Sequence, residues 1–141
     1  MILLDTDHLT FLQFGSEEGT RIRSRLRLLN LSANPPTTII SYHEQVRGWI
    51  GRFASAKTVA DEVRLFAKLH HQLEFFGTLR IVDFTEAAAV EYQRLKSLKI
   101  RVGSMDLKIA AIALANNATV WTRNFVDFRK VPGLNIEDAS I

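Results

Sequence analysis

Short apolar segments that alternate with helical patterns are the feature that most restricts the fold of this chain. The apolar run Ile2–Leu4 and the β-branched run Thr37–Ile40 predict two buried strands, and Leu79–Phe84 and Ala118–Thr122 predict two more. A last short strand is expected near residues 134–136. Together with the helices between the strands, this alternation predicts an α/β fold: a central parallel sheet of four to five strands with helices on both faces.

Helical spacing of apolar residues marks the segments between the expected strands. The helices expected at 41–53 and 58–76 follow each other directly and should form a helical hairpin. The helix expected at 105–115 is apolar on almost every side, which predicts that it is buried. Helices are therefore expected at residues 6–14, around 22–29, and at 41–53, 58–76, 85–98 and 105–115.

The length and composition of the chain indicate a single domain over residues 1–141. A chain of this size can bury roughly two thirds of the surface that it exposes when unfolded. The absence of cysteine excludes a disulfide framework and a thiolate metal site. The opening residues form neither a signal peptide nor a membrane span, and no later stretch reaches membrane length. We expect a cytoplasmic protein that does not enter a membrane.

Four residues with oxygen-bearing side chains lie where the expected strands end or where the next helix begins. Asp5 and Asn124 each follow a strand, whereas Glu44 and Asp106 lie at the head of a helix. In α/β proteins the carboxyl ends of parallel strands point toward one crevice, where ligands bind. Right-handed crossovers would then place these residues at one edge of the sheet, in a single acidic site.

Each acidic residue also has a purely structural explanation. Asp5 suits the N-cap of the helix that follows it. Ser41 and Glu44 have the spacing of a capping box, in which each side chain binds an amide at the start of the helix. Asp106 falls in the first turn of a helix that Ser104 would cap, where a negative charge is favourable. Only the combination of these residues argues for a site.

The repulsion within such a cluster decides between the two explanations. At separations of about 5 Å, two carboxylates repel by roughly 3 kcal/mol, so three pairs cost about 10 kcal/mol. This cost rivals the whole stability of a domain, about 5 to 15 kcal/mol. The cluster must therefore take up protons or hold a cation, and oxygen ligands suit a hard ion such as Mg²⁺. With a net charge of +3, which favours a polyanionic partner, this predicts a metal-dependent nuclease.

Four motifs along the chain resemble the PIN domain and, within it, the VapC toxins of VapBC toxin–antitoxin pairs. They are LLDTD at 3–7, SYHEQVRGW at 41–49, GSMDLKIAAIALANNATVWTRNFVDF at 103–128 and VPGL at 131–134. They occur in the family order and span nearly the whole chain. The third motif is the most specific, because it joins an acidic helix start, a buried helix, a strand and a Thr-x-Asn loop. The resemblance implies a PIN-like fold.

The resemblance also assigns roles to residues of this chain. Asp5, Glu44 and Asp106 match the three core acidic residues of PIN nucleases, and Thr6 and Thr122 match their supporting hydroxyls. The implied chemistry is hydrolysis of an RNA phosphodiester, with Mg²⁺ or Mn²⁺ bound through Asp5 and Asp106. Glu44 would position the ion or accept the proton of the attacking water. Whether one ion or two take part is open.

Two positions depart from the family pattern. The fourth acidic position is often aspartate but is Asn124 here, and Asp127 lies close by as a substitute ligand. Asp7 replaces the usual asparagine and adds a carboxylate whose role the sequence does not define. The family further implies a cognate VapB-type antitoxin, RNA as substrate, and a homodimer.

Two other functions compete with this interpretation. The string DTDH, with Asp5 and Asp7 after an apolar run, also resembles the first motif of haloacid-dehalogenase-like phosphotransferases. That motif is incomplete, because position 9 is Leu9 and no paired acidic motif follows downstream. The second alternative is an inactive PIN-like module that only binds RNA or a partner. Retention of the acidic residues argues against it.

Basic residues near the acidic positions are candidates for binding the RNA phosphates. Arg101, Lys108 and Arg123 are close to them in sequence and are the preferred candidates. The arginines between residues 21 and 27 are expected on a solvated helix face, with an RNA track as the alternative. The four histidines show no metal-ligand spacing and are expected at the surface or within helices.

Overall fold

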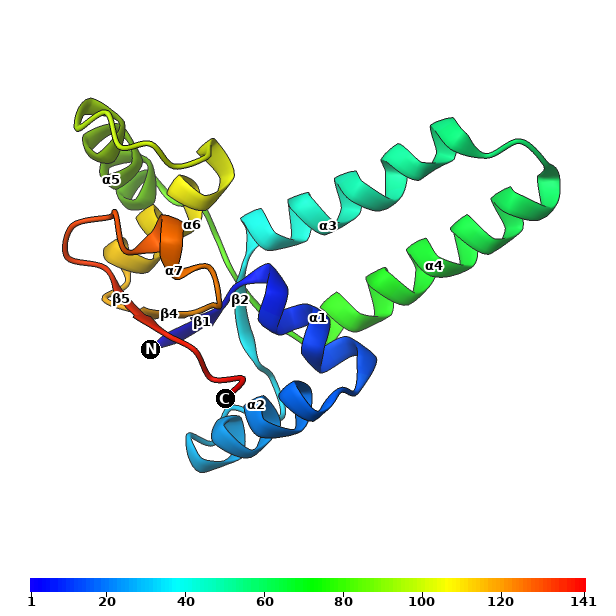
Figure 1. Cartoon of the computed structure of the whole chain (residues 1–141), viewed down its shortest axis with the longest axis horizontal. Coiled ribbons are helices and arrows are strands. Elements are labelled where there is room, and N and C mark those ends of the chain that lie inside the picture. The colour runs from blue at the N-terminus through cyan, green and yellow to red at the C-terminus, as the bar shows by residue number, and fades with distance from the viewer.

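The sheet consists of five short strands that all run parallel. The computed structural model describes residues 1–141, and Figure 1 shows the sheet in the middle of the molecule with helices on both sides. The strand order is β3-β2-β1-β4-β5, and every neighbouring pair is parallel. This confirms the predicted α/β fold. The strands are β1 (Ile2–Leu4), β2 (Pro36–Thr38), β3 (Arg80–Val82), β4 (Thr119–Trp121) and β5 (Asn135–Glu137).

The central strand β1 marks the point where the order of the strands reverses. Leu4 of β1 pairs with Thr37 of β2 on one side and with Trp121 of β4 on the other. The chain first adds β2 and β3 on one side of β1, and it later adds β4 and β5 on the opposite side. Such a reversal opens a crevice at the carboxyl ends of the two strands that flank it. Ligand chemistry is therefore expected where β1 and β4 end.

Helices pack on both faces of the sheet. They are α1 (Thr6–Phe14), α2 (Glu17–Leu28), α3 (Ile39–Gly51), the 3₁₀ turn η1 (Arg52–Ser55), α4 (Val59–Gly77), α5 (Glu86–Ser97), α6 (Ser104–Ala115) and α7 (Phe125–Phe128). Because consecutive strand residues point to opposite faces, Leu3 packs with α5 and α6 in one core, while Leu4 packs with α1 and α2 in a second. None of the helices combines the length and apolar character needed to cross a membrane.

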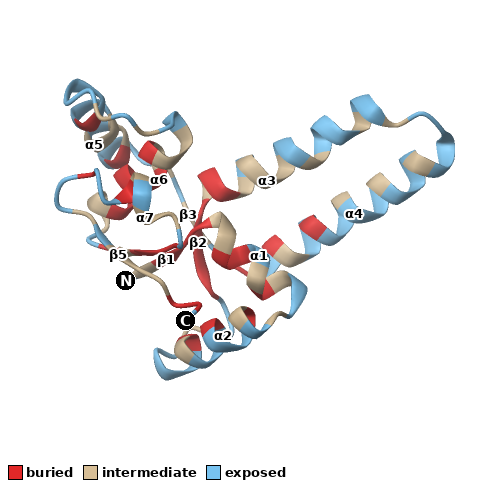
Figure 2. Cartoon of the chain, in the orientation of Figure 1, coloured by how far each residue is buried: buried red, intermediate tan, exposed pale blue.

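The predicted helical hairpin consists of α3, η1 and α4. It projects away from the sheet, and Figure 2 shows that most of its outer half is exposed. The Thr58 side chain begins α4 by accepting a hydrogen bond from the amide of Asp61, as the sequence predicted. The rings of Phe53 and Phe66, 4.7 Å apart, join the two arms. The hairpin is thus an extension of the fold with few core contacts at its tip.

The predicted start of α3 is wrong by two residues. The helix begins at Ile39, and Thr38 is its N-cap, because the Thr38 hydroxyl accepts the amide hydrogen of Ser41 at 3.1 Å. Ser41 therefore lies inside the helix, and the predicted capping box of Ser41 and Glu44 does not form. The β-branched residues Ile39 and Ile40 continue as helix because the fully buried Thr38 already supplies the cap.

The predicted cap of α6 is also wrong. Gly103 is the N-cap and makes no side-chain hydrogen bond, while Ser104 is the first helical residue. The Ser104 hydroxyl lies 3.0 Å from the hydroxyl of Tyr92 on α5 instead. Asp106 still falls in the first turn of α6, so the expectation for Asp106 holds.

Three arginines of α2 bind partners in other parts of the chain. Arg21 donates to the carbonyl of Ser140, Arg23 donates to the carbonyl of Leu12, and Arg25 pairs with Glu137 at the end of β5. These contacts fasten α2 to α1 and to the C-terminal segment. Arg21 and Arg23 are exposed, as expected, and Arg25 is half-buried. All three nevertheless bind partners outside α2, which the sequence did not indicate.

Candidate functional site at the ends of β1 and β4

Asp5 is the buried centre of the crevice. It follows β1 directly, and its side chain is only 6% exposed. One carboxylate oxygen accepts the amide hydrogen of Thr6 at 2.7 Å, which makes Asp5 the N-cap of α1, as predicted. The other accepts the hydroxyl hydrogen of Thr122 at 2.8 Å, and that hydroxyl accepts the amide hydrogen of Asn124 at 2.9 Å. Asp5 and Thr122 thus join the ends of β1 and β4.

Asp7 holds the loop after β4 against the start of α1. Its Oδ2 accepts the backbone amide hydrogen of Arg123 at 2.8 Å, and its Oδ1 lies 2.7 Å from Nδ1 of His8. The Nε2 of His8 accepts the amide hydrogen of Ala139 at 3.1 Å, so the ring proton is on Nδ1 and is donated to Asp7. Asp7 is therefore a fixed carboxylate at the rim of the site.

His8 is a residue whose role the sequence interpretation missed. It lies within α1, as the expectation of a surface or helix position allows, but it is fully buried and holds two partners that the sequence did not indicate. The available signal was its spacing, because His8 is four residues before the buried Leu12 and so shares its face of α1.

Asn124 lies between two carboxylates. Its side-chain amide donates to Asp127 at 3.0 Å and to Asp106 at 3.4 Å. Its side-chain oxygen accepts the amide hydrogen of Asp127 at 3.4 Å, so Asn124 also caps the short helix α7, which the sequence did not predict. The structure thus brings both candidates for the fourth position, Asn124 and Asp127, next to Asp106.

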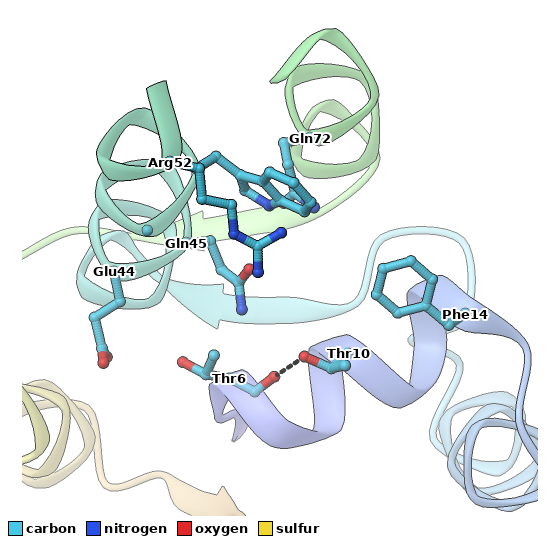
Figure 3. Close-up of a pocket in the computed structure, with 9 residues that line it drawn as sticks. Thr6, Thr10, Phe14, Glu44, Gln45, Arg52 and Gln72 are labelled. Carbon is cyan, nitrogen blue, oxygen red and sulfur yellow. Dashed lines mark hydrogen bonds between the residues drawn. The ribbon is translucent and has the colours of Figure 1, made fainter. Parts of the chain in front are cut away.

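Glu44 enters the site from the first arm of the hairpin. Figure 3 shows its carboxylate pointing away from α3, next to Thr6 at the start of α1. The Oε1 of Glu44 and the Oγ1 of Thr6 are both buried without a hydrogen-bond partner. Burial raises the pKa of Glu44, and the charge of Asp106 raises it further, while Arg47 opposes the rise.

Like charges from several elements act on one another at this edge. Burial, followed by the charge of Asp7 and a smaller contribution from Asp106, raises the pKa of Asp5 to about 7. Burial also raises the pKa of Asp106, with Asp127 and Asp7 adding to the rise. Asp106 thus lies near the other predicted residues: its charge acts on Asp5 and on Glu44, and Asn124 donates to it at 3.4 Å. That the four residues form one catalytic site stays a prediction.

The donor atoms suit a hard divalent cation. They are carboxylate, hydroxyl and amide oxygens, and two of them lack any protein partner. As the side chains stand, no group of three or more His, Asp or Glu residues is close enough to hold a metal ion. An ion would therefore be held by one or two carboxylates together with water, which is the usual pattern for Mg²⁺.

The three basic candidates have other contacts. Lys108 lies over the ring of Tyr92 at 5.5 Å. The guanidinium of Arg123 lies 5.5 Å from the centre of the Phe11 ring and approaches Asp138 at 3.9 Å. Arg101 is exposed, and its carbonyl accepts a hydrogen bond from Lys130. Their binding to RNA phosphates stays a prediction.

Comparison with known proteins supports the same family. No family model matches the chain. Ribonuclease VapC2 of Rickettsia felis is 34% identical over 68 residues, which are 45% of this chain and 51% of that protein, so the match spans about half of that relative's length. In the VapBC2 structure from Rickettsia felis bound to a promoter DNA fragment, a chain matches with a TM-score of 0.71 and 25% identity, over 97% of this chain and 98% of that one. The DNA-bound VapBC of Salmonella typhimurium matches at 28% identity and a TM-score of 0.70, over 99% of each chain.

The chain is similar in sequence to a VapC ribonuclease and in fold to chains of VapBC structures. The matched structures cover nearly its full length, so the likeness in fold includes the sheet, its covering helices and the hairpin. The resemblance seen in the four sequence motifs is thereby confirmed.

The raised pKa of Asp5 leads to a prediction about stability. The folded protein holds the Asp5 proton up to about pH 7, whereas the unfolded chain releases it near 3.8. The stability that Asp5 contributes is therefore complete below pH 3.8 and is lost as the pH rises through 7. Without divalent ions, a rise from pH 5 to pH 8 should therefore increase the free energy of unfolding of Asp5→Asn, relative to that of the wild type, by about 2 to 3 kcal/mol. Asparagine still serves as an N-cap.

Urea unfolding in EDTA at several pH values measures this difference. Asp83→Asn, which removes an exposed carboxylate, is the matched control. A difference between Asp5→Asn and the wild type that stays constant from pH 5 to pH 8 would contradict the buried, repelled state of Asp5.

The contacts of His8 lead to a second prediction. His8→Ala should lower the free energy of unfolding by about 2 to 5 kcal/mol, because the amide of Ala139 and the carboxylate of Asp7 each lose a partner and a cavity forms. His43→Ala, on an exposed side of α3, should change it little. Denaturant unfolding of both variants tests this, and equal stability of the two would show that His8 does not hold Asp7.

Proposed function

We propose that this protein is a metal-dependent endoribonuclease that hydrolyses RNA phosphodiester bonds in the cytoplasm, as a single domain over residues 1–141. The observation that carries the proposal is the set of contacts where β1 and β4 end: the Thr122 hydroxyl binds Asp5 and the amide of Asn124, and the Asn124 side chain donates to Asp106. The charge of Asp106 in turn acts on Glu44. The relative named Ribonuclease VapC2 supports the reaction class. Within toxin–antitoxin pairs, such an enzyme would be the toxin.

Asp5 and Asp106 would hold Mg²⁺ or Mn²⁺, with Thr6 and Thr122 in support. When bound, the ion would orient the scissile phosphate and lower the pKa of the attacking water. Glu44 suits the role of proton acceptor, because burial raises its pKa above that of an ordinary glutamate and its Oε1 has no protein partner.

The remaining polar residues would position this group. Asn124, by donating to Asp106 and Asp127, separates two carboxylates and orients Asp106. Asp127 stays available as an alternative ligand, although Lys130 approaches it at 3.7 Å. Asp7 fixes the backbone of Arg123 and adds negative charge next to Asp5.

The phosphotransferase alternative is poorly supported. It requires Asp7 as a mobile general acid, whereas Asp7 is bound by His8 and by the amide of Arg123. An inactive module that only binds RNA or a partner is also poorly supported. The repulsion around Asp5 lowers the stability of the fold, and such a module would gain nothing in return.

Cleavage of RNA tests the proposed metal residues. Asp106→Asn should lower the cleavage rate by at least about a hundredfold, because it removes a charge that holds the ion. EDTA should abolish wild-type cleavage. Glu86→Gln is the matched control, since it also removes a carboxylate from the first turn of a helix, at an exposed position of α5. Near wild-type cleavage by purified Asp106→Asn would refute the assignment.

Thermal melting separates loss of the ion from loss of the fold. At a hundredfold excess over its Kd, Mg²⁺ or Mn²⁺ should stabilise the wild type by about 2.7 kcal/mol and raise its Tm by several degrees. In EDTA, Asp106→Asn should melt no lower than the wild type, because the variant relieves repulsion at Asp106. A clear destabilisation of that variant would instead indicate a purely structural aspartate.

We infer that a small VapB-type antitoxin binds this protein and that the protein forms a homodimer. The matched structures are complexes of the VapBC kind, which supports an antitoxin partner. The hairpin carries an apolar cavity of about 360 Å³ and large exposed apolar side chains, including Ile50, Phe66 and Leu73. Exposed apolar patches of this kind mark protein interaction sites.

Substitution on the hairpin tests the partner surface. Ile50→Ser and Leu73→Ser should each weaken co-purification with the product of a neighbouring small gene by at least about tenfold, because each removes an exposed apolar contact. Val90→Ser, at an exposed valine of α5, is the control. Unchanged co-purification would exclude the hairpin as the binding surface. Light scattering at micromolar concentration checks the dimer, and a strictly monomeric protein would contradict it.

A further inference from the structure

A polar pocket opens directly beside the acidic site, between α1 and the hairpin. Its cavity volume is about 460 Å³, and it shares Thr6 and Glu44 with the acidic site. Figure 3 shows the pocket with α1 below and the two arms of the hairpin above. The residues that line it are Thr6, Thr10, Phe14, Glu44, Gln45, Gly48, Trp49, Arg52 and Gln72. We call it the hairpin pocket.

Buried polar atoms without partners collect in the hairpin pocket. Four buried side-chain atoms of the protein lack a hydrogen bond, and three of them belong to pocket residues: Thr6 Oγ1, Glu44 Oε1 and Gln72 Oε1. Folded proteins pair nearly all such atoms, so each unpaired one requires an explanation. These oxygens are buried behind the pocket wall, so a ligand that supplies hydrogen-bond donors would satisfy them once the side chains turn toward the cavity.

Gln72 is the most informative of the three. Its side chain is only 2% exposed, and its amide nitrogen donates to Gln13 at 3.0 Å. The side-chain oxygen of Gln72 can only accept a hydrogen bond, and it has no partner in the protein. A ligand that pairs with it must therefore present an N–H or O–H group, as the exocyclic amino group of a nucleobase does.

The pocket also carries a cation that has no salt-bridge partner. The guanidinium of Arg52 lies 4.1 Å from the centre of the Trp49 ring and forms no salt bridge with any carboxylate of the chain. In Figure 3, Arg52 reaches from the hairpin toward the middle of the pocket, above Gln45. Stacking on Trp49 holds the guanidinium plane, so its other face is a surface on which a base can stack, and its N–H groups suit a phosphate.

We propose that the hairpin pocket binds one unpaired nucleotide of the RNA substrate, adjacent to the scissile phosphate, and selects a base with an exocyclic amino group. The proposal rests on the proposed ribonuclease function and specifies its substrate. The base would stack on the Arg52 guanidinium beside Trp49. The Gln72 side chain would turn its oxygen toward the base and accept a hydrogen bond from the amino group, while the N–H groups of Arg52 bind a flanking phosphate. Only two of the nine lining residues are hydrophobic, which favours a nucleotide over an apolar peptide segment.

Single-turnover cleavage of short single-stranded RNAs tests the base selection. The oligonucleotides carry adenosine or purine riboside, which lacks the amino group, on either side of the cleaved bond. The wild type should prefer adenosine by about tenfold at one of these positions, because purine riboside leaves the Gln72 oxygen unpaired. Gln72→Met should lose that preference, and His71→Ala, at the exposed neighbouring position, should keep it.

A binding measurement covers the case in which Gln72→Met fails to fold. Anisotropy with the same RNAs, in the Asp106→Asn background, reports affinity without cleavage. Arg52→Ala removes an exposed side chain and should lower the slope of log K against log salt by about 0.7, the value for one phosphate contact to a single strand. Arg94→Ala, on α5, is the charge-matched control and should leave the slope unchanged.

The outcomes separate this proposal from the proposed function. If the wild type cleaves RNA but shows no amino-group preference, and Arg52→Ala leaves the salt slope unchanged, the pocket proposal is overturned while the nuclease stands. If these variants weaken only the binding of the co-purified antitoxin, the pocket is a peptide site and the proposal is also overturned. Absence of both RNA cleavage and RNA binding by the wild type overturns the function and the pocket proposal together.

Discussion

The hydrogen bond between the Thr122 hydroxyl and the Asp5 carboxylate is the contact on which the site depends. It ties the residue after β1 to the residue after β4, across the point where the strand order reverses. The same hydroxyl accepts the amide of Asn124, so one buried oxygen sets the path of the loop that carries Asn124. Because Thr122 is fully buried, the loop cannot shift without exposing or orphaning this oxygen.

This arrangement holds negative charges together against their repulsion. Asp7 is bound by the backbone of Arg123 and by His8, and His8 is in turn bound by Ala139, so the position of Asp7 depends on the C-terminal segment. Arg21 and Arg25 fasten that segment to α2. Contacts far from the crevice thus contribute to the strain at Asp5. A site prestrained in this way gains affinity for a cation, because binding relieves repulsion that folding has already imposed.

Sequence patterns predicted the parts of the site that depend on strand direction. Asp5 and Asn124 were found by their positions after apolar runs, because parallel strands must end at one edge. The cap of α3 was misplaced because Thr38 and Ser41 are both suitable N-caps, and only the hydrogen bond from the amide of Ser41 to the Thr38 hydroxyl decides between them. The contacts of His8 and Gln72 could not be predicted, since their partners, Ala139 and Gln13, are remote in sequence.

Glu44 links the acidic site to the hairpin pocket. Its pKa responds to Asp106 on one side, while its unpaired oxygen lies among the pocket residues on the other. Thr6, at the start of α1, also borders both: its amide donates to Asp5, and its side chain lines the pocket. A ligand in the pocket would therefore change the surroundings of the proposed proton acceptor, and an ion at the carboxylates would change the charge at the mouth of the pocket. Substrate selection and hydrolysis would be coupled through these two residues, because both rely on the same buried oxygens.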